Sequence, residues 1–311
     1  MSLEKFFHLK ENHTDVKTEI MAGITSFMTM AYILAVNPNI LSASGMDHGA
    51  VFTATAVASF IGTLCMALFA NYPFALAPGM GLNAYFAYTV VLGMGYTWQV
   101  ALAAVLAEGL IFIVLSIFNV REAIFNAIPF NLKKAVSVGI GLFIAFIGLQ
   151  NAKIVIGSAT LVSLFSLDGY NQTLNGLTAS FQDVGITVLL AVIGVIITAI
   201  LVVKNIKGNI LWGILITWAL GIICQFAGLY VPNGDLGFYS LLPDFSSGIS
   251  IPSLAPILGK FSLDGVPILE FIVIVFAFLF VDIFDTIGTL IGVASKADML
   301  DEEGKLPRIK G

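Results

Sequence analysis

The feature that most constrains this chain is a long apolar run, near its C-terminal end, that carries two carboxylates. Between Pro267 and Val293 the other residues are almost all Ile, Leu, Val, Phe, Ala and Gly. As a helix, this run would cross the roughly 30 Å of a bilayer's hydrocarbon core. Asp282 and Asp285 lie inside it, and Thr289 follows one turn after Asp285, which places all three on one helical face. A carboxylate at that depth is costly unless it faces protein or a watery cavity, so the face indicates a ligand or ion site.

Composition predicts that the rest of the chain is an all-α polytopic membrane protein. Hydrophobic residues make up 58% of the sequence and charged residues 11%, whereas soluble domains carry roughly 25% charged residues. Hydropathy predicts about eight membrane spans. These spans are residues 20–41, 50–70, 72–92, 98–118, 133–151, 184–203, 208–231 and 267–293.

The distribution of basic residues predicts the orientation of these spans. With the N-terminus in the cytoplasm, only Lys153 and Lys260 fall outside, which leaves twelve of the fourteen Lys and Arg residues on the cytoplasmic side. Cytoplasmic loops are enriched in Lys and Arg in this way. We therefore expect a multi-pass protein of the cell (plasma) membrane with a cytoplasmic N-terminus.

The third predicted span has an abnormal sequence. Pro78, Gly79 and Gly81 should interrupt a helix at membrane depth, where broken backbone is tolerated only inside protein or beside a cavity. Interrupted helices of transporters bind polar ligands with the backbone groups freed in this way. The alternative is a proline kink whose backbone groups are satisfied by neighbouring helices.

Two other sets of polar residues lie in apolar spans. Glu108, in the fourth span, is either an ion site or a buried carboxyl hydrogen-bonded to a neighbouring helix. Thr25, Ser26 and Thr29, in the first span, either line a pocket or bond carbonyls of their own helix. The three histidines lie outside the spans, and we expect no metal site, no cofactor and no nucleic-acid partner.

Several longer strings make the chain similar to a known family. They are residues 22–33 (AGITSFMTMAYI), 36–38 (VNP), 77–84 (APGMGLNA), 119–129 (NVREAIFNAIP) and 282–290 (DIFDTIGTL). In this order they resemble the AzgA-like branch of the nucleobase–cation symporter-2 family, the guanine/hypoxanthine/adenine permeases. The resemblance extends over nearly the whole chain.

The resemblance implies a fold of two inverted seven-helix repeats, divided into a core and a gate domain. The 311 residues would supply one complete repeat and the first helix of the second. The implied divisions are a cytoplasmic N-terminus at 1–19, core helices 1–4 at 20–118, gate helices 5–7 at 119–231, an outside connection at 232–266, and core helix 8 with a cytoplasmic end at 267–311. The counterpart of the broken third span would lie beyond Gly311. We therefore expect a piece of a longer protein that neither transports nor binds purine by itself.

The resemblance also implies a function, the secondary active transport of purine nucleobases coupled to protons or, alternatively, to sodium. Asp285 is expected to accept hydrogen bonds from purine N–H groups, with Thr289 one turn on. Asp285, Asp282 and Glu108 are the candidates for proton coupling. The expected substrate-binding set is completed by the backbone of three consecutive residues, by an aromatic ring that stacks on the base, and by a hydroxyl of the first span: Asn83, Ala84, Tyr85, Phe86 and Thr29.

Two other functions fit some of these features. A xanthine/uracil or anion carrier of the same fold is the nearest alternative, although carboxylates that face the site disfavour an anion. An intramembrane aspartyl protease needs two carboxylates on separate helices, whereas Asp282 and Asp285 share one helix. We expect a transporter rather than an enzyme, embedded in the lipid bilayer as a monomer or a homodimer.

Overall fold

The computed structural model describes residues 6–11, 13–118, 129–158, 161–165, 173–174, 177–178, 180–243 and 250–296. The predicted start of the gate domain at residue 119 and the last fifteen residues of the predicted cytoplasmic end lie outside the described residues. By their internal contacts the residues divide into two compact units. One unit contains residues 1–32 and 145–250, and the other contains residues 33–144 and 251–311.

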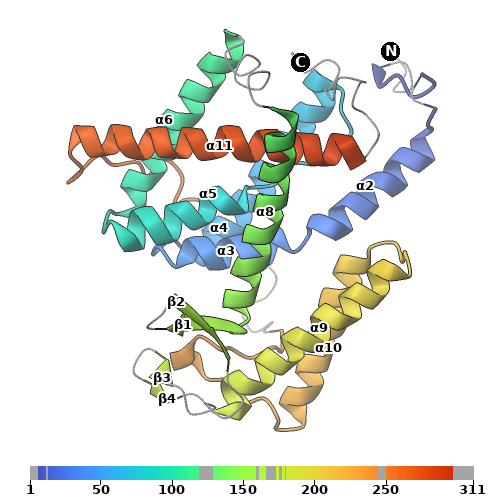
Figure 1. Ribbon diagram of the computed structural model, residues 1–311, viewed down its shortest axis with the longest axis vertical. Helices are drawn as coiled ribbons and strands as arrows, with labels where there is room; N and C mark the ends of the chain where they lie inside the picture. Colours follow the sequence, from blue (N-terminus) through green and yellow to red (C-terminus); the bar gives the residue numbers. More distant parts are fainter. Residues whose placement is uncertain are drawn as a thin grey trace. The chain divides into compact units, whose positions relative to one another are not determined.

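The second of these units is a bundle of helices that contains the acidic helix. Its elements are α3 (Ile33–Ser42), α4 (His48–Cys65), η1 (Met66–Ala70), α5 (Met80–Ala84), η2 (Tyr85–Gly93), α6 (Trp98–Ile117), most of α8 (Phe130–Asn151), and α11 (Ile268–Lys296). Helix α3 packs on α4, and α11 packs on both α5 and α6 (Figure 1). Helix α11 has 29 residues and is therefore about 43 Å long. It holds the predicted acidic face within one continuous helix.

Local interactions fix the ends of several helices in this unit. The Asp47 carboxylate accepts a hydrogen bond of 2.7 Å from the backbone N–H of Ala50 and so caps α4. In the loop before α6, the Tyr96 hydroxyl donates to the carboxylate of Glu270, in the first turn of α11. This hydrogen bond raises the pKa of Tyr96, because the carboxylate stabilises the protonated phenol.

The third predicted span is broken in the structure. Residues 71–79 form no helix, and the chain becomes helical again only at Met80. The five residues of α5 continue directly into η2, a helix with wider, π-type turns. Pro78 and Gly79 stand at the end of the break, as predicted, whereas Gly81, which was also expected to interrupt the helix, lies inside α5.

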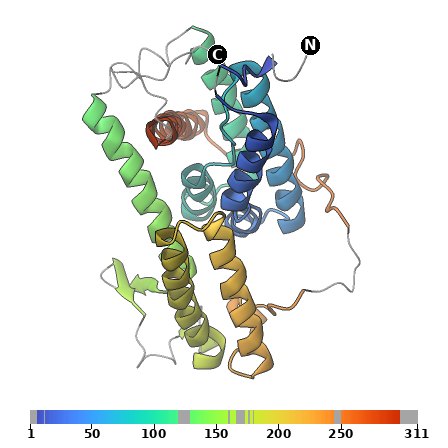
Figure 2. The same cartoon turned by 90° about the vertical axis from the view of Figure 1, so that its right-hand side faces the viewer.

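The other unit consists of helices with two short hairpins. It contains α2 (Val16–Met30), the end of α8, η4 (Phe181–Gly185), α9 (Ile186–Val203), α10 (Asn209–Phe226) and η5 (Gly234–Leu236). Strands β1 (Val155–Ser158) and β2 (Leu161–Leu164) pair antiparallel, as do β3 (Thr173–Leu174) and β4 (Leu177–Thr178). Figure 2 shows α9 and α10 packed side by side.

The first helix of the chain is capped by an acidic residue. The carboxylate of Asp15 accepts a 2.7 Å hydrogen bond from the backbone N–H of Thr18 at the start of α2. This bond lowers the pKa of Asp15, since it stabilises the ionised form.

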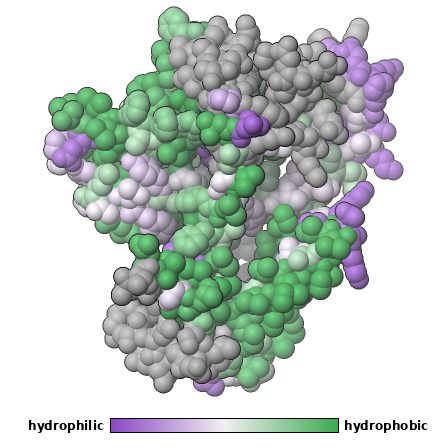
Figure 3. All heavy atoms as spheres, in the orientation of Figure 1, coloured by the Kyte–Doolittle hydropathy of each residue, from purple (hydrophilic) through white to green (hydrophobic). Residues whose placement is uncertain are grey.

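The outer surfaces of the helices are apolar to a degree that is typical of a membrane protein. On α9 and α10, Val195, Ile196, Ile223 and Phe226 are each more than half exposed. Hydrophobic atoms accordingly cover much of the surface of this helix pair (Figure 3). Water would strongly disfavour such a surface, whereas lipid tails accept it.

Five helical segments among the described residues are long and apolar enough to cross a membrane. They are Val16–Ser42, His48–Ala70, Trp98–Ile117, Phe181–Val203 and Asn209–Phe226. The other three predicted spans fall on α5 with η2, on α8 and on α11. A polytopic helical fold is therefore established, and the count of eight spans stays a prediction.

Candidate functional site

The two carboxylates of α11 lie on a face of the helix that packs against other helices of its unit. Asp282 and Asp285 are both partly buried, while the neighbouring residues Ile283 and Gly288 are buried. Thr289 is exposed, although it lies one turn beyond Asp285. Although the sequence places all three residues on the same helical face, neighbouring helices cover the two carboxylates and leave Thr289 exposed.

Asp285 lies against Gly79, the residue that caps α5. A Cβ atom added to Gly79 would be 2.6 Å from Oδ2 of Asp285 and 3.9 Å from its Cγ. Oδ2 of Asp285 therefore fills the space beside Gly79, at the end of the break. The N-terminus of a helix carries a partial positive charge, which favours a carboxylate in this position.

The non-helical stretch before Gly79 is held along α11 by its own contacts. The Thr63 hydroxyl accepts a 2.9 Å hydrogen bond from the backbone N–H of Leu76 and lies 3.3 Å from the carbonyl oxygen of Leu76. Phe74 is buried against Leu290 and Ala294 of α11. The stretch thus runs opposite in direction to α11, from Phe74 beside Ala294 to Gly79 beside Asp285.

The backbone groups beyond the break are used differently from the expectation. The N–H of Asn83 donates to the carbonyl of Gly79 at 3.2 Å, and the N–H of Tyr85 donates to carbonyls of α5. These two donors are satisfied because the helix resumes at Met80, before the residues predicted to bond the base. The expected edge hydrogen bonds from the N–H groups of Asn83 and Tyr85 are therefore not available in this conformation.

The side chains of the same segment point into the packed unit. Ala84 and Phe86 are buried, with 7% and 5% of their surface exposed. The ring of Tyr85 meets the ring of Phe278 edge to face, with centroids 4.9 Å apart. Asn83 is partly exposed, and its amide donates a hydrogen bond to the side chain of Asn37.

Glu108 lies beside the other carboxylate of α11. It projects from α6 with 5% of its surface exposed. Its carboxyl group lies close enough to that of Asp282 for the two groups to interact electrostatically. Oε1 of Glu108 is buried and has no hydrogen-bond partner among the described residues.

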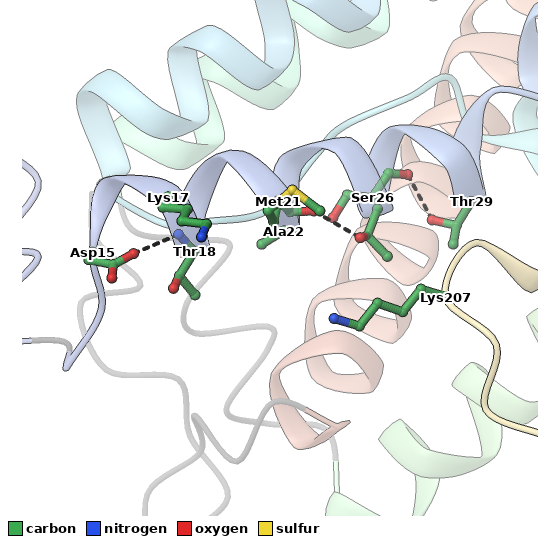
Figure 4. Close-up of a pocket in the computed structure, with 9 residues that line it drawn as sticks. Asp15, Lys17, Thr18, Met21, Ala22, Ser26, Thr29 and Lys207 are labelled. Atoms are coloured by element: carbon green, nitrogen blue, oxygen red, sulfur yellow. Dashed lines mark hydrogen bonds between the residues drawn. The ribbon is translucent and has the colours of Figure 1, made fainter.

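Thr29 lies in the unit that contains α2, apart from the unit of Asp285. The hydroxyls of Thr25 and Thr29 bond the carbonyls of Met21 and Ser26, at 2.8 and 2.7 Å. Both threonines also line a groove of about 810 Å³ along α2, into which Lys207 extends (Figure 4). The pocket and the intrahelical bonds, which the sequence offered as alternatives, thus occur together.

Side chains that could bind a metal ion do not cluster in the part of the chain that the structure describes. No three His, Cys, Asp or Glu side chains there are close enough to hold a metal ion. Asp285 instead lies beside Gly79, and Asp282 lies beside Glu108.

Apolar helices long enough to cross a membrane, with acidic residues beside a broken span, are the features of a multi-pass membrane protein. Comparison with known proteins identifies the family. Residues 17–308 match the model of a group described as the Permease family, the nucleobase–cation symporter-2 family. The chain belongs to this family.

Three relatives illustrate the similarity. A Methanocaldococcus jannaschii protein named as a permease is 48% identical over 309 residues, which is 99% of this chain and 64% of the relative. The guanine/hypoxanthine permease PbuO of Bacillus subtilis is 42% identical over 98% of this chain and 65% of its own length. The adenine permease AdeP of Escherichia coli is 39% identical over 99% of this chain and 62% of its own length. The chain thus spans slightly under two thirds of the length of these relatives.

Proposed function

We propose that the protein carries purine nucleobases across the cell membrane together with protons, and that Asp285 receives the base. The observation that carries this proposal is the contact of Asp285 with Gly79, where the broken span ends. A carboxylate beside interrupted backbone at membrane depth matches the way discontinuous helices bind polar substrates. An ionised carboxylate only accepts hydrogen bonds, so it suits the ring N–H and amino groups of guanine, hypoxanthine and adenine.

The relatives support the same class of substrate. PbuO and AdeP are named as guanine/hypoxanthine and adenine permeases. The acidic residues Asp282, Asp285 and Glu108 also disfavour an anion, because a negative substrate would be repelled at such short range. An anion carrier is therefore disfavoured, and xanthine and uracil serve as comparison substrates in the uptake experiment.

Proton coupling is assigned to the same acidic cluster. Asp285 lies beside the break, and Asp282, one turn earlier on α11, lies beside Glu108. Carboxyl groups that pair or desolvate one another take up and release protons as their surroundings change. Thr289 and Thr29 remain proposed substrate-binding residues, and sodium is the alternative coupling ion.

The architecture proposed for this activity has eight spans with the N-terminus in the cytoplasm. Core segments would be 20–118 and 267–311, and the gate segment 119–231, with 232–266 between them outside the cell. The division of the chain into two compact units supports two domains. The proposed boundary assigns residues 20–41 to the core, whereas in the structure α2 packs on α10, a helix of the proposed gate segment.

Uptake by the full-length gene product in proteoliposomes tests the proposal. Radiolabelled guanine, hypoxanthine and adenine should enter in response to an inward proton gradient, and a protonophore should abolish accumulation. Asp285→Asn should eliminate this uptake, because the amide cannot take up a proton and presents a donor where an acceptor is needed. Asp285→Glu should retain partial activity with altered KM.

The matched control is Glu270→Gln, which changes another carboxylate of α11 at its first turn. This variant should keep proton-driven purine uptake. Normal pH-dependent uptake by Asp285→Asn would transfer the coupling role to Asp282 or Glu108. Uptake of uracil, and not of any purine, by the unmodified protein would refute the proposed substrate class.

A further inference from the structure

A chain of side-chain hydrogen bonds ends at Asn83. Its other members, Asn37 and Thr55, have no part in the proposed binding of the base. The amide nitrogen of Asn83 donates to Oδ1 of Asn37. The amide nitrogen of Asn37 donates to the hydroxyl of Thr55 at 2.7 Å. The Thr55 hydroxyl donates to the carbonyl of Val51, also at 2.7 Å. The chain therefore links α5, α3 and α4.

The two inner members of this chain are removed from solvent. Asn37 is 3% exposed and Thr55 is 2% exposed. A buried polar group without partners is costly, so both residues need the hydrogen bonds that they make. Such a network, when fully satisfied, holds its members in one arrangement.

The direction of the hydrogen bonds determines which end of Asn83 is available. Thr55 has one hydroxyl proton, and the carbonyl of Val51, which can only accept, takes it. Thr55 must then accept from the NH₂ group of Asn37, which leaves Oδ1 of Asn37 to face Asn83. Asn83 consequently donates its own NH₂ group to Asn37. Its carbonyl oxygen receives no hydrogen bond from the described residues.

Asn83, whose side-chain oxygen accepts no hydrogen bond from the described residues, is close in sequence to the proposed site. Asn83 stands one helical turn after Gly79, to which it is joined by a backbone hydrogen bond of 3.2 Å. Gly79 in turn contacts the carboxylate of Asp285. Two acceptors, an amide oxygen and a carboxylate, thus flank the first turn of α5.

We infer that Asn37 and Thr55 are positioning residues that hold the Asn83 amide with its carbonyl oxygen towards the substrate. Asn83 then accepts a hydrogen bond from a donor on the base, which is a ring N–H or an exocyclic amino group. This inference rests on the proposed function and refines it, because it adds a second acceptor to the site and explains how that acceptor is oriented.

Hypoxanthine uptake by variants of the full-length protein in proteoliposomes tests the inference. Thr55→Val has nearly the same shape but removes the hydroxyl, and it should raise KM about tenfold with little change in Vmax, the effect of one misplaced hydrogen bond. Thr55→Ser should restore the original KM. In an Asn83→Ala background, Thr55→Val should have no further effect on KM, because its target is gone.

Thr53→Val is the matched control in the same helix. The Thr53 hydroxyl is also buried and bonded, at 2.9 Å to the carbonyl of Pro252, but it is not part of the chain. Its KM for hypoxanthine should stay unchanged. An equal rise in KM for Thr53→Val, or none for Thr55→Val, would overturn the positioning role.

Methylated ligands test the orientation of the amide separately. Among hypoxanthines methylated at single ring nitrogens, at least one should be rejected by the unmodified protein and tolerated better by Asn83→Ala. Unchanged discrimination against every methylated analogue would mean that Asn83 reads no donor. Absence of purine uptake by the unmodified protein would instead refute the proposed function itself.

Discussion

At the scale of single residues, Gly79 shows how space can require a glycine. Its backbone angles, φ −72° and ψ 122°, are open to any L-residue, so conformation does not demand glycine here. The requirement comes from Asp285, whose carboxylate occupies the place that a Cβ atom would take.

Substituting this glycine should therefore disturb the carboxylate without unfolding the helix. Gly79→Ala would place its methyl group 2.6 Å from Oδ2 of Asp285, so that the carboxylate must move. We expect KM for purine uptake to rise at least about tenfold, with a melting temperature in detergent close to that of the unmodified protein.

Gly81→Ala is the control, two residues along. A Cβ atom at Gly81 would meet only Cε1 of Phe143, at 3.8 Å, an ordinary contact distance. This variant should transport normally. Impaired uptake by both variants, or by neither of them, would contradict this prediction. It would show that the position of Asp285 beside the break does not determine the affinity for purine.

At the scale of elements, α9 and α10 pack through two reciprocal pairs of glycine and threonine. Thr217 of α10 lies over Gly194 of α9, and Thr198 of α9 lies over Gly213 of α10. Each threonine hydroxyl also bonds the glycine carbonyl of its own helix, at 2.8 Å for Thr198 and 2.7 Å for Thr217. Small residues of this kind allow close approach of helices in a membrane.

A methyl group at one of these glycines should separate the two helices. Gly213→Ala would bring the new carbon to 3.0 Å from Cβ of Thr198, and overpacking of this kind typically costs about 1–3 kcal/mol. A lower melting temperature of the purified protein is the expected result.

Gly148→Ala provides the comparison, because a Cβ atom there would meet nothing within 4 Å. Alanine also has the higher helix propensity, so this variant should melt no lower than the unmodified protein. Equal melting temperatures for the Gly213 and Gly148 variants would show that the glycine–threonine pairs do not limit the approach of α9 and α10.

At the scale of the whole molecule, the apolar helices and the uneven distribution of Lys and Arg together determine how the protein would lie in a bilayer. Lys207 is in the connection between α9 and α10, and Lys260 is in the connection before α11. Both lysines are exposed. The proposed topology places Lys207 in the cytoplasm and Lys260 outside the cell.

Cysteine labelling of intact cells can check this topology. Lys207→Cys and Lys260→Cys would be made separately in a background that lacks the native thiols Cys65 and Cys224, both of which are free. A membrane-impermeant maleimide should label position 260 directly, and position 207 only after permeabilisation. The reverse pattern would show an inverted protein, and direct labelling at both positions would rule out the predicted span count.

Some properties could be read from the sequence because they depend on local patterns. Apolar runs predict helices that avoid water, and Pro78 with its neighbouring glycines predicts the break that the structure has before Met80. The spacing of Asp282 and Asp285 likewise predicts one shared helical face. These features are encoded within a few residues of each other, so no knowledge of the packing is needed.

Other properties were decided by tertiary structure alone. Nothing in the spacing of residues pairs Glu108 with Asp282, sets Gly79 against Asp285, or leads from Asn83 through Asn37 to Thr55. The use of the Asn83 and Tyr85 N–H groups within the helix also follows only from where the helix resumes. These contacts join residues far apart in sequence, and buried polar groups must find whichever partners the packed helices bring near. The sequence by itself thus determined the membrane helices and the acidic face, and packing determined what that face touches.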